Sequence, residues 1–479
     1  MTVRIYNTLH NRKEDFIPTE DGKVKMYVCG PTTYNYIHLG NARPIVAFDV
    51  IRRYFAYIGY DVTYVQNFTD VDDKIINRAN EEGIDPKDLA EKYIAAYFED
   101  ADRLGVKRAD VHPRVTEHMD DIIKMVQGII DNGLGYEIDG DVYFEVRKFK
   151  GYGKLSGRSL DEMQSGARIA VDEQKRDPMD FALWKAAKPG EPAWESPWGM
   201  GRPGWHIECS AMSSKYLGKT FDIHGGGADL IFPHHENEIA QSEGCNCCKS
   251  VNYWIHNGFI TINSEKMSKS LGNFFLLRDI LDKFPGPVVR FYLMSTHYRS
   301  PLDFDDKKLE ASAKSLERIW NAYRLTEEKL ALLEKQEGAD SDAPEKLSAI
   351  TTETRKKFKD AMNDDFNTSL ALASVFDLCR DVNSIVNVQG FSGGADTIAA
   401  LKGVLAFFGE LNEVMNVIVP QEEKGDDLSN ELLNIIMAMR TKARAAKDWG
   451  TADYIRDELK AIGIVIEDAP DGPRWKKEK

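Results

Sequence analysis

The chain has 479 residues with 77 acidic and 62 basic side chains, which gives a formal net charge of −15. That balance argues against a general nucleic-acid-binding protein, because phosphate contacts need clustered Lys and Arg, but it allows a local basic surface. The length is too great for one hydrophobic core, so we expect about two to four domains. We find no apolar run long enough to span a membrane and no secretory signal at the N-terminus, so we expect no membrane association and a cytoplasmic location.

The first predicted elements belong to a parallel sheet. In chain order, the hydrophobic pattern predicts a strand, a helix and a second strand over residues 24–30, 42–58 and 61–68. Gly59 ends the helix. A strand, loop, helix and strand in this order open a Rossmann-like α/β fold. The first half of the sheet domain is therefore expected over 1–115.

A similar pattern returns over 205–302, the expected second half of the sheet domain. A short strand ends in three glycines at 225–227, a helix begins near Pro233, and 251–262 returns as a strand. The segment between the halves, 116–204, begins with a helix and also carries a strand pattern. We interpret it as an inserted domain.

From about residue 303 the composition changes to long helical patterns. They predict four helices, over 306–334, 346–363, 369–388 and 396–417. We therefore expect an all-α bundle over 303–425, which contains one polar break, and a small separate domain over 426–479, which follows a second one. Within 428–479 there are ten Lys and Arg and nine Asp and Glu, a balance of +1 (10 − 9). The tail is thus the segment best suited to meet nucleic acid.

The loop after the first strand has features of a nucleotide site. It contains His38-Leu39-Gly40-Asn41 at the start of the predicted helix. Gly40 allows close approach of a phosphate because it has no Cβ, and His38 can donate to phosphate oxygens as charge builds there. Taken alone, the tetrapeptide is more often a simple helix start with an incidental histidine.

The pentapeptide Lys266-Met267-Ser268-Lys269-Ser270 is a more specific signal. A given pentapeptide arises by chance in a chain this long with odds of roughly 10⁻⁴. Lys266 and Lys269 in a Ser-rich loop can close over a triphosphate and neutralise the departing pyrophosphate. The alternative is a solvated basic loop, and the presence of both motifs makes that alternative the weaker one.

A metal site is suggested by four residues of suitable chemistry. His234 and Glu238 stand four apart, on one face of a helix, while Cys29 and Cys209 lie near a strand end or turn. Two thiolates, an imidazole and a carboxylate are suitable zinc ligands. His235 would lie about 100° around the same helix and should point elsewhere. Spacing alone leaves open that the cysteines are small buried hydrophobes and that the His–Glu pair is a solvated helix face.

A second cysteine group, Cys245-Asn246-Cys247-Cys248, lacks a partner cluster of ligands. We interpret it as a surface turn between a helix and a strand.

These motifs resemble the class I cysteinyl-tRNA synthetase family, bacterial type. The resemblance extends over nearly the whole chain. Segments similar to that family are 37–41, 66–76, 151–156, 204–212, 222–238, 266–270, 295–301, 443–448 and 463–468. It implies a Rossmann-like catalytic domain with an inserted domain, then an all-α bundle and a small anticodon-binding domain.

The resemblance also implies a reaction. Cysteine is activated by ATP, with Mg²⁺, to cysteinyl-adenylate, and the cysteinyl group then passes to the 3′ end of tRNA(Cys). His38, Lys266 and Lys269 would be catalytic, with His38, Gly40, Asn41 and Lys269 at the ATP. One Zn²⁺ would be held by Cys29, Cys209, His234 and Glu238 and would recognise the substrate sulfur. The cysteine and adenylate pocket would be lined by Thr69, Trp205, His224 and Asp229.

For the tail, the expected tRNA contacts are Arg440, Arg444, Lys447, Arg456 and Trp475, with a solvated helix face as the alternative for each. A monomer is expected. Two rival functions share the motifs: a cysteine ligase acting on an amino sugar, which would not need the tail, and a tRNA-binding paralogue without catalysis, which would not need the intact motifs.

Overall fold

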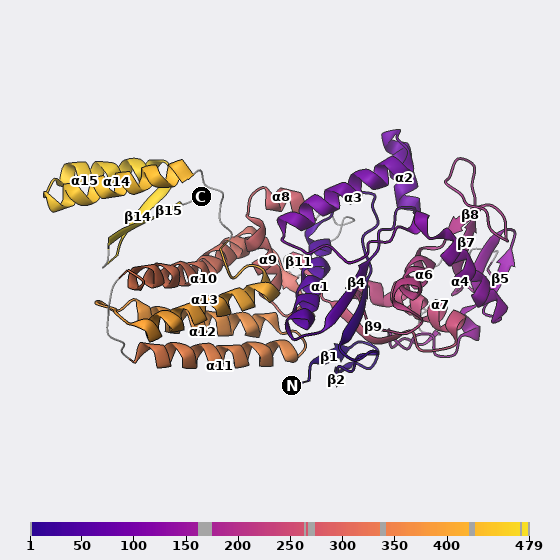
Figure 1. The fold of residues 1–479 in the computed structure, drawn as a ribbon. Helices are drawn as coiled ribbons and strands as arrows, with labels where there is room; N and C mark the ends of the chain where they lie inside the picture. The colour runs from indigo at the N-terminus through magenta and orange to yellow at the C-terminus, as the bar shows by residue number, and fades with distance from the viewer. Residues whose placement is uncertain are drawn as a thin grey trace.

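The computed structural model describes residues 2–160, 175–262, 265–266, 274–335, 342–420, 427–469 and 472–477. At its centre is a four-stranded sheet in the order β10-β9-β3-β4, with every neighbouring pair parallel. The strands are β3 (Lys23–Val28), β4 (Asp61–Gln66), β9 (Phe221–Gly227) and β10 (Val251–Asn257). This confirms the predicted Rossmann-like α/β fold, since β3 and β4 are joined by the predicted helix α1 (Leu39–Tyr57) (Figure 1).

The arrangement of these strands determines where a site can form. From β3 the chain crosses to β4 on one side, while β9 pairs with β3 on the other. The carboxyl ends of β3 and β9 therefore flank the point where the strand order reverses, which is where open α/β sheets bind ligands. Cys29 follows β3 directly, and its backbone N–H donates to the carbonyl of Gly225 in β9 at 3.2 Å.

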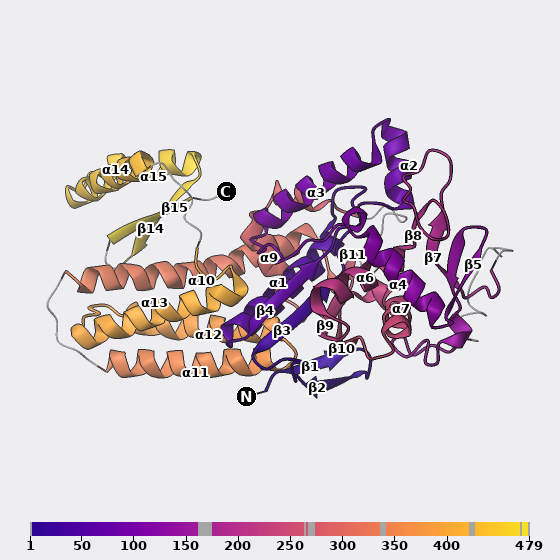
Figure 2. The same cartoon turned by 45° about the vertical axis from the view of Figure 1, so that its right-hand side comes forward.

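A large segment lies between β4 and β9. It contains α2 (Asp73–Glu82), α3 (Pro86–Arg103), α4 (Met119–Asp131) and a second sheet with the order β5-β6-β7-β8, all antiparallel. These strands are β5 (Gly135–Ile138), β6 (Asp141–Phe144), β7 (Phe181–Ala186) and β8 (Gly201–Pro203). α4 contacts α6 (Trp205–Leu217) and α7 (Glu236–Asn246), so the inserted segment shares a core with the second half of the sheet domain (Figure 2).

After β10 comes a small three-stranded sheet. β11 (Ile260–Ile262) pairs antiparallel with β12 (Glu265–Lys266) and parallel with β13 (Leu302–Asp303). Between β12 and β13 lie α8 (Leu277–Leu281) and α9 (Gly286–Met294). A hairpin at the N-terminus, β1 (Arg4–Asn7) with β2 (Arg12–Asp15), lies beside β10.

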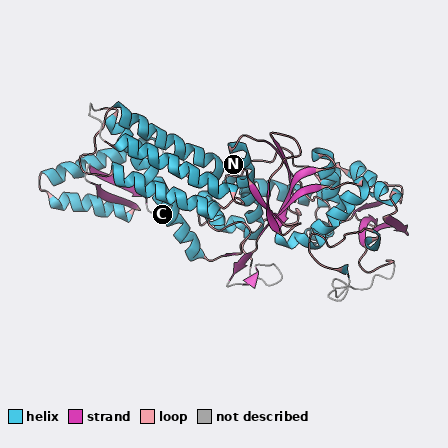
Figure 3. Cartoon of the chain, turned by 90° about the horizontal axis from the view of Figure 1, so that it is seen from below, coloured by secondary structure: helices cyan, strands magenta, loops and turns pink. Residues whose placement is uncertain are grey.

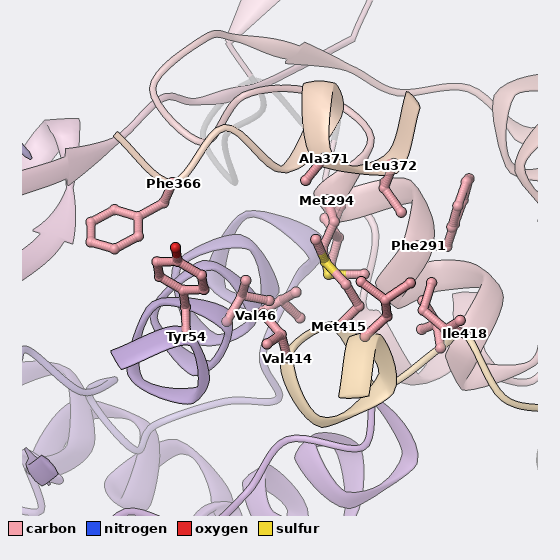
Figure 4. Packing of buried hydrophobic residues seen from close by; sticks show 14 of the residues in the cluster. Val46, Tyr54, Phe291, Met294, Phe366, Ala371, Leu372, Val414, Met415 and Ile418 are labelled. Carbon is pink, nitrogen blue, oxygen red and sulfur yellow. The ribbon is translucent and has the colours of Figure 1, made fainter. Parts of the chain in front are cut away.

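The C-terminal region is helical, as the sequence predicts. The bundle consists of α10 (Asp306–Leu333), α11 (Ala343–Asn363), α12 (Thr368–Val386) and α13 (Ala395–Met415), aligned along the long dimension of the molecule (Figure 3). Its core is continuous with that of the sheet domain. Figure 4 shows this junction, where Val46 and Tyr54 of α1 meet Phe291 and Met294 of α9 and residues of α12 and α13.

The tail forms a small separate unit. Helices α14 (Asp427–Ala445) and α15 (Trp449–Ala461) pack together beside the antiparallel hairpin of β14 (Ile464–Ala469) and β15 (Gly472–Lys477). Arg474 of β15 forms an ion pair with Glu328 of α10 at 2.9 Å. Among the described residues, no helix is both long and apolar enough to cross a membrane.

Candidate metal centre and nucleotide site

Two cysteines, a histidine and a glutamate from three parts of the chain meet at the carboxyl end of β3. Cys29 Sγ lies 3.7 Å from Cys209 Sγ and 3.6 Å from His234 Nε2. Glu238 Oε1 lies 3.4 Å from Cys29 Sγ and 3.0 Å from His234 Nε2. Cys209 comes from α6 and Glu238 from α7, and both are 2% exposed. The structure thus brings together the four residues that the sequence suggested as ligands.

Two separations measured from Cys29 Sγ fit a tetrahedral metal ion. Zinc bonds of about 2.3 Å to sulfur and about 2.0–2.1 Å to nitrogen imply separations of about 3.8 Å between two sulfurs and about 3.6 Å between sulfur and nitrogen. The observed values are 3.7 Å and 3.6 Å. Two soft thiols with an imidazole and a carboxylate are also the donor types that zinc takes.

The electrostatics of the cluster favour a bound cation. Burial raises the pKa of Glu238 and of Cys29 well above their ordinary values. The hydrogen bond from Cys29 lowers the pKa of Cys209 to about 7. Burial also lowers the pKa of His224, whose ring lies in the same cluster. Burial thus makes a charge of either sign costly here unless it is paired, and a divalent cation would pair with the carboxylate and the thiolates.

A second set of possible ligands shares Cys29 and Glu238 with the first. His224 Nε2 and His235 Nε2 each lie 3.4 Å from Cys29 Sγ. The expectation that His235 points elsewhere is therefore wrong. It assumed one regular helix from Pro233, whereas a wider turn, η4 (Ile231–His235), precedes α7 and directs both neighbouring imidazoles to the same side.

Outer histidines orient the inner ones, a feature that the motif reasoning missed. His206 Nδ1 lies 2.8 Å from His234 Nδ1. On the other side, His256 Nε2 lies 2.7 Å from His235 Nδ1, and its own Nδ1 lies 2.8 Å from the Thr8 hydroxyl. Such outer partners set the tautomer of a ligand ring. The sequence held one signal for this network, since five of the ten histidines fall between residues 206 and 256.

His38 is positioned by the start of α1. It is the N-cap residue, and its Nδ1 accepts the backbone N–H of Asn41 at 3.2 Å. The Asn41 side-chain oxygen accepts the backbone N–H of His38 in return, at 3.1 Å, which completes a capping box. Because Nδ1 accepts a hydrogen bond, the neutral ring carries its proton on Nε2. Gly40 lies in the same first turn.

The second ATP motif begins in β12, which ends at Lys266. Lys269 lies outside the described residues. The chain that follows returns to the first motif: Leu39 N–H donates to the carbonyl of Phe275 at 3.1 Å, and Leu277 N–H donates to that of Ile37 at 2.9 Å. The described chain that resumes at residue 274 is therefore paired with the start of α1.

The residues expected to line the substrate pocket occupy different environments. Thr69 is buried, and its hydroxyl donates to the Glu208 carboxylate at 2.9 Å. The Trp205 ring is 39% exposed and lies 4.4 Å from the ring of His234. His224 touches the metal cluster, so it belongs to the second ligand set as well. Asp229 is exposed in the turn η3 (Ala228–Leu230) after β9.

The expected tRNA contacts in the tail differ in how far their side chains are exposed to solvent. Arg440 is only 5% exposed, so its side chain is far less accessible to a phosphate than the other expected contacts. Arg444 and Lys447 are exposed. Arg456 is exposed too, but it pairs with Asp453 and Asp457 at 2.9 Å each. Trp475 is half-buried in β15.

The group Cys245, Cys247 and Cys248 lies where α7 ends and β10 follows, and Cys247 and Cys248 are exposed. No metal-binding group among the described residues includes them.

Comparison with known proteins identifies the family. Residues 15–314 match the tRNA synthetases class I (C) catalytic domain, 357–418 the DALR domain, and 426–475 the cysteinyl-tRNA ligase anticodon binding domain. A cysteine–tRNA ligase of Pelotomaculum thermopropionicum is 59% identical, with 99% of this chain and 100% of that protein covered. One from Desulforamulus reducens is 58% identical, with the same coverage.

Solved structures share the fold at low identity. A Mycobacterium tuberculosis methionyl-tRNA synthetase in complex with methionyl-adenylate has a TM-score of 0.63 at 16% identity, covering 82% of this chain and 92% of that one. A LeuRS–tRNA ternary complex from Agrobacterium radiobacter has a TM-score of 0.61 at 12% identity, covering 84% and 85%. On the strength of the full-length relatives and the matched domains, the chain belongs to the cysteinyl-tRNA synthetase family.

Proposed function

We propose that the chain performs the cysteine–tRNA ligase reaction of its family with a zinc ion that distinguishes cysteine from serine. The observation that carries this proposal is the largely buried cluster of Cys29, Cys209, His234 and Glu238, in which the Cys29–Cys209 and Cys29–His234 separations fit a tetrahedral ion. When bound, zinc supplies a soft Lewis acid that takes a thiolate far more readily than a hydroxyl. Shape alone separates these two substrates poorly.

The chain's own groups would activate the cysteine carboxylate. In the first step this carboxylate attacks the α-phosphorus of ATP, and pyrophosphate leaves. His38, with its proton on Nε2, is suited to donate to the phosphate oxygens as they gain charge, while Gly40 and Asn41 line the nucleotide. Lys269 would neutralise the leaving pyrophosphate and Lys266 would support closure of the loop. Mg²⁺ would accompany the ATP.

The pocket between these two centres would hold the amino acid and its adenylate. Its proposed lining is Thr69, Trp205, His224 and Asp229. Trp205 is suited to cover the substrate, because its exposed ring already lies against His234. In the second step, the terminal ribose hydroxyl of tRNA(Cys) attacks the carbonyl of the adenylate and takes the cysteinyl group, and AMP leaves. Positioning of the two reactants is then the main contribution of the protein.

Each step of this reaction is assigned to a segment of the chain. We propose sheet-domain halves at 1–115 and 205–302, an inserted domain at 116–204, a bundle contacting the tRNA at 303–425, and an anticodon-binding domain at 426–479. Arg444, Lys447, Arg456 and Trp475 remain the proposed tRNA contacts. The enzyme is proposed to act as a cytoplasmic monomer.

Two rival functions are disfavoured. An amino-sugar ligase would not need an anticodon-binding domain, yet 426–475 matches one. A non-catalytic paralogue would not need the donor cluster, which is complete.

The proposal is tested by ATP–pyrophosphate exchange with cysteine and with serine, together with the zinc content of each enzyme. Wild type should carry about one zinc per chain and strongly prefer cysteine. Cys209→Ser should lose zinc affinity and cysteine preference together, while His235→Phe should keep both if the first ligand set holds the ion. Unchanged discrimination in a zinc-free Cys209→Ser enzyme would refute the role of the metal. Full retention of zinc by Cys209→Ser with loss from His235→Phe would instead assign it to the second set.

A further inference from the structure

Asp365 is a buried carboxylate at the junction between the bundle and the sheet domain. It lies between α11 and α12 and is 0% exposed. Its Oδ1 accepts the Tyr298 hydroxyl at 2.8 Å and the backbone N–H of Tyr6 at 2.8 Å. Its Oδ2 pairs with Arg299 Nε at 2.6 Å. A residue of the bundle thus holds two segments of the sheet domain at once, the β1 hairpin and the loop that follows α9.

The backbone at this junction is held in an unusual conformation. Asp365 and Phe366 both have positive φ, +66° and +51°. Non-glycine residues are rarely found there, and they persist only where the surroundings over-determine the conformation. Here the Asp365 N–H donates to the Arg4 carbonyl at 2.9 Å, and the Phe366 ring packs against Phe55. It also lies against Tyr54 (Figure 4). Two successive residues in this conformation indicate that the contacts of Asp365 and Phe366 with the sheet domain require the chain to turn here.

The loop held by Asp365, residues 297–300, also holds the helix that begins with His38. Arg43 of α1 is 1% exposed, and its guanidinium donates to the carbonyls of His297 and Ser300. It also donates to Gly258 and Phe259, at 3.0 Å and 2.7 Å. Burial lowers the pKa of Arg43 to about 10, so the group stays charged at neutral pH.

The same loop supports the strand that leads to Lys266. The Gly258 N–H donates to the Tyr298 carbonyl at 2.9 Å. A Cβ at Gly258 would lie 2.6 Å from the Arg299 carbonyl oxygen, so this approach requires glycine. From Gly258 the chain enters β11, which pairs with β12 and with β13 on the far side of the loop. The 297–300 loop therefore contacts both the helix that begins after His38 and the segment that leads to Lys266.

We propose that Asp365 is a positioning residue that couples the tRNA-bearing bundle to the two nucleotide motifs through the 297–300 loop. Cysteinyl transfer needs the 3′ end of the tRNA to meet an adenylate held by the sheet domain, while the bundle and tail hold the rest of the tRNA. A small misplacement far from the reacting atoms is enough to slow such a step. The tRNA is not a reactant in activation, and the Arg43 contacts to His297 and Ser300 hold the loop without Asp365.

The inference rests on the proposed binding of tRNA by the bundle and of ATP at the start of α1. The test uses Asp365→Asn, which keeps the Oδ1 acceptor and removes the charge that faces Arg299. The matched control is Asp364→Asn. The Asp364 carboxylate is half-exposed and forms a surface ion pair with Lys13 at 2.7 Å. Exposed pairs of that kind contribute little. Three quantities are compared: ATP–pyrophosphate exchange, the dissociation constant for tRNA, and single-turnover transfer from preformed adenylate.

For Asp365→Asn we expect transfer to slow by about tenfold or more, with exchange and tRNA affinity within about threefold of wild type. Asp364→Asn should leave all three unchanged. Tyr298→Phe removes only the hydroxyl that donates to Oδ1; it should slow transfer by about fivefold and serves if Asp365→Asn fails to fold. The inference is overturned if the folded variants transfer cysteine as fast as the control. It is also overturned if ATP–pyrophosphate exchange falls by the same factor as transfer. Full exchange activity in a His38→Ala enzyme would instead count against the proposed ATP site.

Discussion

The Nδ1 atoms of His206 and His234 lie 2.8 Å apart, with His234 turning its Nε2 toward Cys29 and Glu238. One of the two Nδ1 atoms must donate and the other accept. A His234 ring that offers the Nε2 lone pair to a metal carries its proton on Nδ1, so His206 accepts that hydrogen bond. His206 thereby determines the state in which His234 can act as a ligand.

The first prediction concerns this outer histidine. His206→Phe keeps the ring volume but removes the acceptor, so zinc affinity should fall by about tenfold to a hundredfold. Competition with a chelator measures the affinity. The control is His118→Phe, at a buried histidine that contacts the Arg114 carbonyl and the Tyr216 hydroxyl, away from the cluster. That variant should lose stability but keep its zinc affinity; equal zinc affinity in both variants would count against the role of His206.

The second prediction concerns stability at low pH. Burial lowers the pKa of His112 from 6.5 to about 4, and the ring is held neutral, with Nδ1 2.9 Å from the Gln66 carbonyl and Nε2 accepting the N–H of Ala109. Below pH 6.5 the unfolded chain binds a proton that the folded chain does not. The contribution of His112 is therefore complete above that pH and is lost as the pH falls to about 4, a change of about 3 kcal/mol in the free energy of unfolding.

Urea unfolding of wild type and His112→Gln at several pH values checks this. Glutamine does not titrate, so the stability of wild type relative to the variant should decline over that window. A difference that does not depend on pH would show that His112 is not responsible.

The third prediction concerns Lys269. Lys269→Ala should strongly reduce ATP–pyrophosphate exchange while cysteine still binds, because the lysine is assigned to the leaving pyrophosphate and not to the amino acid. Exchange kinetics and calorimetric cysteine binding separate the two. Lys188→Ala, at an exposed lysine of the inserted segment, is the control. Parallel loss of exchange and binding in Lys269→Ala would contradict the assignment.

The fourth prediction concerns the tail. Deletion of residues 428–479 should spare cysteine activation and impair tRNA charging. Within the tail, Arg444→Gln with Lys447→Asn should weaken tRNA binding and make it less sensitive to salt, with the slope falling by about one for each phosphate that is no longer neutralised. Arg440→Gln should instead destabilise the small domain, because this side chain is buried. Unimpaired charging by the deletion variant would refute the assignment of the tail.

Although the order of the strands in the sheet could not be predicted, the central strands, their parallel arrangement and the four bundle helices could be predicted from hydrophobic period and motif order. So could the four-residue donor set, once the chain resembled a family with known ligands. Local spacing failed at His235, because the turn before α7 is not a regular helix. It also gave no sign that Arg440 would be buried, because tertiary packing and not residue type decides whether an arginine is exposed.

Other contacts cannot be recognised from the sequence around the residues that make them. Asp365 meets Tyr6 and Tyr298 across separations of 359 and 67 residues, and nothing in the sequence around it points to either partner. The pairing of His206 with His234 likewise depends on how α6 approaches the turn before α7. Such contacts follow from the fold and become visible only once it is known.

The central claim is that a metal at Cys29, Cys209, His234 and Glu238 recognises the sulfur of cysteine. The most direct test replaces zinc with Co²⁺ and records the thiolate-to-cobalt absorption as substrate is added. Cysteine should increase that absorption, because a further thiolate joins the ion, and serine at the same concentration should not. A spectrum that cysteine leaves unchanged, in an enzyme that still forms adenylate, would contradict the account.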